Sequence, residues 1–187
     1  MSILKIYQFG EEVLRKPCEE ILKNEILNTK YKKLISDMIE TMYKCCGVGL
    51  AAPQVGINKK IVIIDTQWGD PKFSPNPMVL INPKIVESEG EMYSEEGCLS
   101  FKSGKKNLKK IAEEKGVFLT KVKRFQKVKV IYLDLNGKEK EISAEGDLLC
   151  RCLQHEIDHL SGILLIDKAE DKEEVEKELK SNGFKVQ

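Results

Sequence analysis

Histidine, tryptophan and long apolar runs are scarce in this sequence of 187 residues. It contains two histidines and one tryptophan, and no segment approaches the roughly 20 consecutive apolar residues that a membrane-spanning helix needs. The first residues are only briefly apolar before Glu11 and Glu12, which is unlike a secretory signal peptide. These absences argue against a membrane-embedded or exported protein and favour a cytoplasmic one with no membrane partner.

The six cysteines lack the pattern of a disulfide framework. Frameworks of that kind stabilise small secreted domains, whereas this chain is long enough to bury a core of its own. Cys45 and Cys46 are adjacent, and Cys150 and Cys152 would project from opposite sides of a helix. We therefore expect all six thiols to be reduced.

Two helices are predicted by the spacing of apolar residues. The first covers Tyr31–Tyr43, where apolar side chains recur every three or four positions. The second begins after Gly146 and ends near His159 or Ser161, before Gly162, a residue type that commonly follows a helix end. Shorter helices are expected at 107–115 and 171–180.

Strands are predicted by short β-branched runs and by one hairpin pattern around Asn136-Gly137. Strands followed by a late helix indicate an α+β fold. No repeat, linker or low-complexity tract divides the chain, so we expect a single catalytic domain over residues 1–187. The expected strands are 61–64, 79–82 and 84–87 on either side of Pro83, and 128–133 and 139–143 in the hairpin.

Charge is unevenly distributed along the chain. The net charge is +1, but the segment from Lys102 to Arg124 holds nine basic and two acidic residues, a local charge of +7 that leaves −6 for the remainder. Such a segment can orient a protein toward a polyanion. The alternative is a solvated surface loop, which is the more common role of a charge run.

The strongest chemical signal is the segment His155-Glu156-Ile157-Asp158-His159 in the second predicted helix. Residues four apart share one face of a helix, so both imidazoles can reach a single metal ion. Glu156 lies next to the first histidine and is placed to move a proton. Since these are the only two histidines in the chain, a chance surface pair is a poor explanation, and we predict a metal site.

A catalytic metal site usually has three protein ligands and one open position. No third histidine exists, so the third ligand is either a carboxylate or Cys98, which follows a glycine in Glu95-Glu96-Gly97-Cys98-Leu99-Ser100. A cysteine considered alone is more often a buried apolar thiol. Beside a helix with two histidines, Cys98 becomes the better candidate.

A third segment, Gly47–Gly56, is rich in small residues that let a backbone or substrate approach closely. Within it, Gln54 is a neutral hydrogen-bond donor that could stabilise charge in a site. The alternative is a helix end followed by a turn.

Together, these three segments resemble the peptide deformylase family. The family motifs G-Φ-G-L-A-A-x-Q (Φ is aliphatic), E-G-C-L-S and Q-H-E-x-D-H are present in order as Gly47–Gln54, Glu96–Ser100 and Gln154–His159. Residues 13–17 and 160–164 are also similar to the family, so the resemblance covers most of residues 3–168. It implies that mostly antiparallel strands pack around a central metal-binding helix, and that the enzyme removes the N-formyl group from the initiator methionine of new proteins.

The resemblance also implies roles at the reacting bond. Cys98, His155 and His159 would bind one divalent metal ion, and Glu156 would act as general base and then as general acid. Gln54 and the backbone N–H of Leu99 would hold the oxyanion.

Substrate binding is implied for a second group of residues. The backbones around Val48, Gly49 and Gly97 would pair with an extended peptide. Candidates for the wall of the methionine pocket are Val48, Leu148, Cys152 and the methylene stem of Arg151.

Two departures from the family pattern stand out. Phe101-Lys102-Ser103 replaces the usual aliphatic residue and proline after Ser100, and the basic segment that follows is expanded. Arg151 stands where the family tends to have an aliphatic residue; its methylenes could line the pocket while the guanidinium reaches solvent.

The implied ion is Fe²⁺ in a cell, with Zn²⁺, Ni²⁺ and Co²⁺ as alternatives that the ligand types also suit. The implied partner is the N-formylmethionyl nascent peptide, and the basic segment makes the ribosome a candidate partner. Direct binding to DNA is not expected.

The sequence leaves two rival functions open. A zinc endopeptidase shares the pattern His-Glu-x-x-His but would need a downstream carboxylate ligand such as Glu173 or Glu174. A non-catalytic metal-binding module would more naturally close its shell with four ligands.

Overall fold

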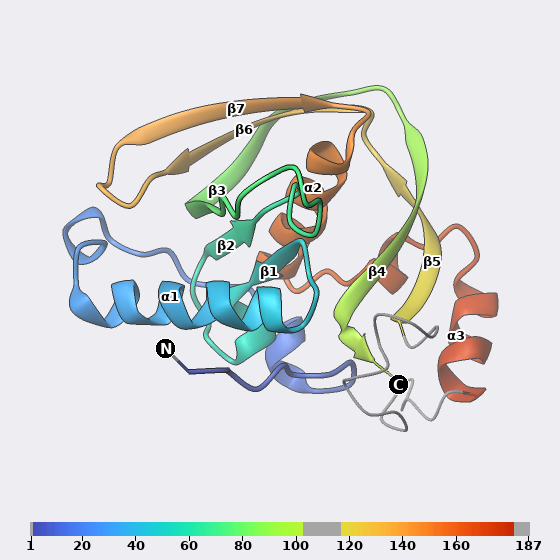
Figure 1. Cartoon of the computed structure of the whole chain (residues 1–187). Helices are drawn as coiled ribbons and strands as arrows, with labels where there is room; N and C mark the ends of the chain where they lie inside the picture. Colours follow the sequence, from blue (N-terminus) through green and yellow to red (C-terminus); the bar gives the residue numbers. More distant parts are fainter. Residues whose placement is uncertain (1, 103–116, 182–187) are drawn as a thin grey trace.

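The computed structural model describes residues 2–102 and 117–181, shown in Figure 1. The fold is α+β, as predicted: β1-β2-β3-β6-β7 form an antiparallel five-stranded sheet, and β4 and β5 form a two-stranded sheet. The helices are α1 Thr29–Lys44, α2 Leu148–Leu160 and α3 Lys172–Ser181. The strands are β1 Gly49–Ala51, β2 Ile61–Ile64, β3 Met78–Glu89, β4 Met92–Lys102, β5 Val117–Arg124, β6 Lys127–Leu133 and β7 Glu139–Glu145.

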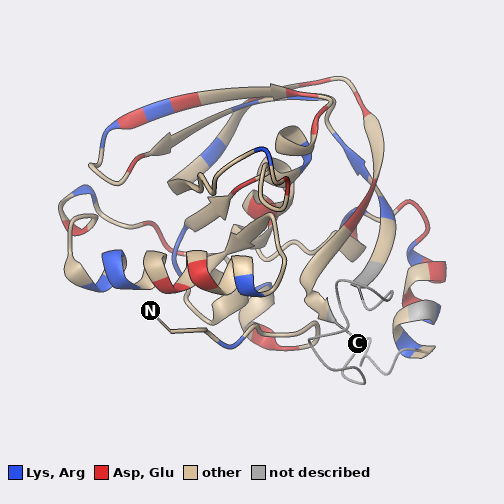
Figure 2. Ribbon diagram, in the orientation of Figure 1, with Lys and Arg blue, Asp and Glu red and all other residues tan. Residues whose placement is uncertain are grey.

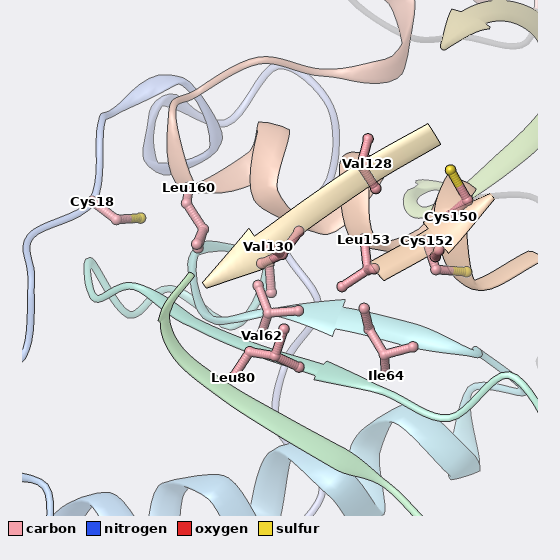
Figure 3. Packing of buried hydrophobic residues seen from close by; sticks show 12 residues of the cluster. Cys18, Val62, Ile64, Leu80, Val128, Val130, Cys150, Cys152, Leu153 and Leu160 are labelled. Atoms are coloured by element: carbon pink, nitrogen blue, oxygen red, sulfur yellow. The ribbon is translucent and has the colours of Figure 1, made fainter. Parts of the chain in front are cut away.

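The five-stranded sheet is buried on both faces at β2. Because successive side chains of a strand point to opposite faces, Val62 and Ile64 belong to one apolar cluster and Ile61 and Ile63 to another. The first cluster includes Leu153 and other residues of α2, as Figure 3 shows, and the second includes residues of α1. Each such buried side chain stabilises the fold by about 1.5–3 kcal/mol. Helix α2 is therefore held firmly against the sheet.

The two-stranded sheet has a separate apolar core. Phe101 of β4 and Val122 of β5 are fully buried, together with Leu165 from the 3-10 turn η5 (Leu165–Lys168) and Leu179 from α3. Cys98 belongs to the same cluster. This packing fixes the part of β4 that lies near α2.

Both ends of α2 are defined by local chemistry. At the start, the side chain of Asp147 accepts a hydrogen bond from the backbone N–H of Cys150 (2.7 Å), which caps the helix. At the end, Gly162 has a φ of 72° and donates its N–H to the carbonyl of His159. A Cβ at Gly162 would overlap the carbonyl oxygen of Arg15. Glycine is thus required both for the turn and for the approach of the N-terminal segment.

Most predicted elements are confirmed to within two or three residues. The predictions for α1, β2, the β6–β7 hairpin, α2 and α3 match their observed bounds. The prediction of two strands around Pro83 was wrong: β3 is one strand, with a register shift between Ile81 and Lys84 where Asn82 has a φ of 50°. Strands β1, β4 and β5 were not predicted, and the helix expected at 107–115 lies outside the described residues.

Disulfides and membrane-spanning helices are both absent from the described part of the chain. All six cysteines lie within it and none forms a disulfide, as expected. No helix within residues 2–102 and 117–181 combines the length and apolarity needed to cross a membrane.

We predict that Gly162→Ala lowers the free energy of unfolding by on the order of 3 kcal/mol, because it combines an unfavourable φ with overlap on a neighbouring backbone. Gly146→Ala is the matched control: its φ is 66°, but a Cβ there would meet nothing within 4 Å, so about 1–2 kcal/mol is expected. Urea unfolding measures both. Equal losses in the two variants would show that the close approach to Arg15 contributes nothing.

Candidate metal centre and active site

The polar face of α2 carries both histidines into the interior. His155 is 8% exposed and His159 is 1% exposed. One donor atom from each, together with Cys98 Sγ from β4, lies within 4.8 Å of the other two. Cys98 Sγ lies 3.3 Å from His159 Nε2. A thiolate and two imidazoles at this spacing form a donor set suited to one divalent transition metal ion.

Cys98 reaches the histidines because β4 departs from regular pairing beside it. The ladder between β4 and β5 is regular up to Gly97, and its register then shifts before Lys102. Cys98 and Leu99 lie in that irregular stretch, where neither residue has an assigned partner in β5. This irregularity places the thiol over α2.

A buried ionic network orients His155. Glu96 Oε2 lies 3.0 Å from His155 Nδ1, which leaves Nε2 to face the site. Arg124 donates to both oxygens of Glu96 at 3.0 and 2.8 Å, and also to Asp158 at 2.5 Å. Burial alone would raise the pKa of Glu96, but the hydrogen bonds from His155 and Arg124 outweigh it and bring the pKa to about 2. Glu96 is therefore a carboxylate that supports a metal-binding histidine.

Glu156 lies beside the donor set and is itself buried. Its Oε2 has no hydrogen-bond partner among the described residues, and burial raises the pKa of its carboxyl to about 7. A Cβ at Gly49 of β1 would overlap Glu156 Oε1, so the glycine makes room for the carboxylate. A buried oxygen without a partner is costly unless a function needs it.

The amide of Gln54 has a fixed orientation. Its Oε1 accepts from the backbone N–H of Ala51 (2.9 Å), so its NH₂ group points toward Cys98 Sγ (3.4 Å) and Ser100 Oγ (3.2 Å). Gln54 is 1% exposed. The site therefore has a rigid neutral donor beside the thiol.

These residues border one cavity of about 440 Å³. Eleven of the twelve site residues expected from the sequence line it, and the twelfth, His159, lies beneath it in the donor set. The cavity wall also includes Cys45, Cys46, Gly47, Glu95 and Glu96. The expected residues that line it are Val48, Gly49, Gln54, Gly97, Cys98, Leu99, Leu148, Arg151, Cys152, His155 and Glu156.

The structure adds roles that sequence reasoning missed. Arg124 was counted as part of a basic surface segment, which is wrong: it is 4% exposed and ion-paired. Asp158 is the second carboxylate partner of Arg124. The side chain of Gln154 accepts from Phe125 N (2.8 Å) and donates to Phe125 O (2.9 Å), which anchors the turn between β5 and β6.

The endopeptidase alternative requires a carboxylate ligand downstream of the histidines. Glu173 and Glu174 are exposed in the first turn of α3, and among the described residues the donor group that includes both histidines is completed by Cys98. The chemistry of these donors and the unpartnered Glu156 oxygen both fit a bound metal ion. Fold and site together define a metal-dependent hydrolase.

Comparison with known proteins identifies the family. The sequence profile of the polypeptide deformylase family matches residues 3–175. A peptide deformylase of Thermodesulfovibrio yellowstonii is 50% identical over 168 residues, 90% of each chain, and one of Prochlorococcus marinus is 45% identical over 97% of this chain and 81% of its own. The crystal structure of a Synechococcus elongatus peptide deformylase in complex with actinonin is similar, with a TM-score of 0.83, 38% identity and coverage of 98% and 89%. The chain therefore belongs to the polypeptide deformylase family and is a deformylating hydrolase.

We predict that Glu96→Gln weakens metal binding by about 10- to 100-fold, because His155 loses the carboxylate that orients it. The variant should also be less stable, since Arg124 keeps one of its two carboxylates. Glu91→Gln, which affects only an exposed pair with Lys123, is the control. Chelator competition measures the affinity; an unchanged metal affinity in folded Glu96→Gln protein would remove Glu96 from this role.

Proposed function

We propose that this chain hydrolyses the N-formyl group of formylmethionyl peptides at the centre formed by Cys98, His155 and His159, with Glu156 as the proton-transfer group. The observation that carries this proposal is the Glu156 oxygen without a hydrogen-bond partner beside the three donors. A carboxyl group with a pKa near 7 can both accept and release a proton at neutral pH.

A divalent ion held by these ligands would supply Lewis acidity and lower the pKa of a water molecule to about 7. The chain's own residues would do the remainder. Glu156 accepts a proton from the attacking water as its oxygen bonds to the formyl carbon. Glu156 then gives that proton to the leaving nitrogen as the C–N bond breaks, and the products are formate and a peptide with a free N-terminal methionine.

Negative charge grows on the formyl oxygen during the attack. The fixed NH₂ group of Gln54 is one donor for it, and the backbone N–H of Leu99, in the irregular stretch of β4, is a second. Each donor of this kind stabilises the transition state by about 2.7–4 kcal/mol. Neither donor has to reorganise during the reaction, because packing already fixes both.

We propose that the peptide binds in the cleft between an edge of β1 and an edge of β4. In the described part of the chain, β1 pairs only with β2, and β4 pairs only with β5, so each strand has one edge without a partner strand. The backbones of Val48, Gly49 and Gly97 border the cavity there and can pair with an extended peptide. Val48, Leu148, Cys152 and the stem of Arg151 would enclose the methionine side chain.

The proposal extends to where the enzyme works. We propose that the enzyme works in the cytoplasm, where formylated nascent chains are made. A single catalytic domain over residues 1–187 stays a prediction.

Ribosome docking through the basic segment Lys102–Arg124 also stays a prediction. Of its basic side chains, those described are each paired with a carboxylate: Lys121 with Glu170, Lys123 with Glu91, and Arg124 with two acids. Figure 2 likewise shows basic and acidic residues interspersed along α1 and β7.

We predict that Glu156→Gln retains the metal but lowers deformylation by about 10²–10⁴-fold, because the amide cannot take up the proton. Formate release from a formyl-methionyl peptide gives the rate, and elemental analysis gives the metal content. Glu12→Gln, a change at an exposed residue that does not line the cavity, should leave both unchanged. Near-normal turnover with metal retained would exclude Glu156 from the mechanism.

We also predict that protein reconstituted anaerobically with Fe²⁺ turns over formyl peptides faster than protein reconstituted with Zn²⁺. The ligand types admit both ions, together with Ni²⁺ and Co²⁺, so the ion has to be assigned by activity. Equal metal loading in each sample is the control. A fully active zinc enzyme with no gain from Fe²⁺ would contradict the iron assignment.

A further inference from the structure

Among the described residues, Arg151 has no carboxylate partner, unlike the other two arginines of the chain. Arg15 pairs with Asp167, and Arg124 pairs with Glu96 and Asp158. Arg151 has no ion pair among the described residues, and its Nε makes only a long contact, 3.4 Å, with the backbone oxygen of Asp147. In the described part of the chain the two NH₂ groups of this guanidinium have no hydrogen-bond partner, so they can bind an anion.

Arg151 lies where a bound substrate could contact its side chain. Arg151 is half-buried and lines the same cavity as Cys98, His155 and Glu156. It precedes His155 by four residues, which is one helical turn, or about 6 Å along α2. In the opposite direction along the helix, His159 is 1% exposed and does not line the cavity. We therefore take the bound peptide to continue from the reacting bond toward Arg151.

The spacing of an extended peptide then selects one substrate residue. Side chains of a strand alternate between two sides, and residues on the same side are about 6.6 Å apart. With the methionine side chain against Leu148 and Cys152, the next side chain on the α2 side belongs to the third residue. The stem of Arg151 would border the methionine as well, so the guanidinium at the far end of that stem is placed to meet the side chain of the third residue.

We propose that Arg151 is a specificity-determining residue that favours formyl peptides with a carboxylate side chain on their third residue. This inference rests on the proposed function, because it assumes that the cleft binds an extended formyl peptide. Arginine suits the task, since its planar guanidinium binds a carboxylate through two parallel hydrogen bonds. Glu95 of β4 also lines the cavity and is exposed, without an ion pair in the described part of the chain. Because Glu95 would repel a carboxylate, we expect the preference only for a side chain that faces α2.

The test compares two peptides that differ in one charge, formyl-Met-Ala-Asp-Ala-amide and formyl-Met-Ala-Asn-Ala-amide. The amide removes the terminal carboxylate, which could otherwise reach Arg151 in a short peptide. With the metal-loaded enzyme, kcat/KM should favour the aspartate peptide by about three- to tenfold, mainly through KM. The ratio should shrink as salt is added, because the pair is partly exposed to solvent.

Variants of Arg151 test whether this residue causes the preference for the aspartate peptide. In Arg151→Gln the ratio should fall to about one, and in Arg151→Lys, which keeps the charge but loses the two-pronged geometry, part of it should remain. Lys32→Gln removes one charge from an exposed position of α1 and should leave the ratio as it is. Moving the aspartate to the second residue should give no gain over asparagine there.

The possible failures are distinguishable. If the metal-loaded enzyme hydrolyses the asparagine peptide but shows no preference for aspartate, or if Arg151→Gln keeps the preference, the inference about Arg151 is wrong and the proposed function stands. If neither peptide is hydrolysed, the proposed function is wrong and the inference falls with it.

Discussion

The structure depends on keeping a charged and metal-binding group of side chains inside a protein interior. Removing such groups from water is costly unless hydrogen bonds or opposite charges compensate. Here Arg124 neutralises Glu96, and Glu96 in turn binds His155. Asp158, one residue before His159, binds the remaining side of the guanidinium. The ionic network thus ties β4, β5 and α2 together at the point where the donor atoms meet, and removing Arg124 would leave the buried Glu96 carboxylate without its cationic partner.

The metal centre also depends on glycines that let neighbouring groups approach the backbone closely. Gly49 leaves room for the Glu156 carboxylate, and Gly162 lets the N-terminal segment pass over the end of α2. The irregular stretch of β4 after Gly97 turns Cys98 toward the histidines and frees Leu99 from the ladder. Local backbone geometry therefore decides which polar atoms reach the cavity, while the apolar clusters on both faces of the sheet hold that geometry in place. An arrangement fixed before the substrate arrives suits catalysis, because donors that are already oriented need not reorganise.

Sequence reasoning succeeded where the signal is local. The two histidines are four residues apart on a helix with recognisable ends, and β2 is an uninterrupted apolar run. It failed for β4, whose buried positions include Ser94, Glu96 and Ser100. A strand that buries polar residues has no apolar alternation to reveal it. The partners of Arg124 lie 28 and 34 residues away, so only the folded chain shows that this residue is internal. Cys98 was found through its motif and its proximity in sequence to glycine, not through any pattern of burial.

The central claim is that one thiolate and two imidazoles bind a single metal ion beside Glu156. X-ray absorption spectroscopy of protein loaded anaerobically with one equivalent of Fe²⁺ tests it directly, because sulfur and nitrogen ligands differ in bond length and scattering. The account predicts one sulfur ligand and two imidazole nitrogens, with the sulfur signal absent in Cys98→Ala. A coordination shell without sulfur in the unaltered protein, or one in which a carboxylate replaces an imidazole, would contradict it.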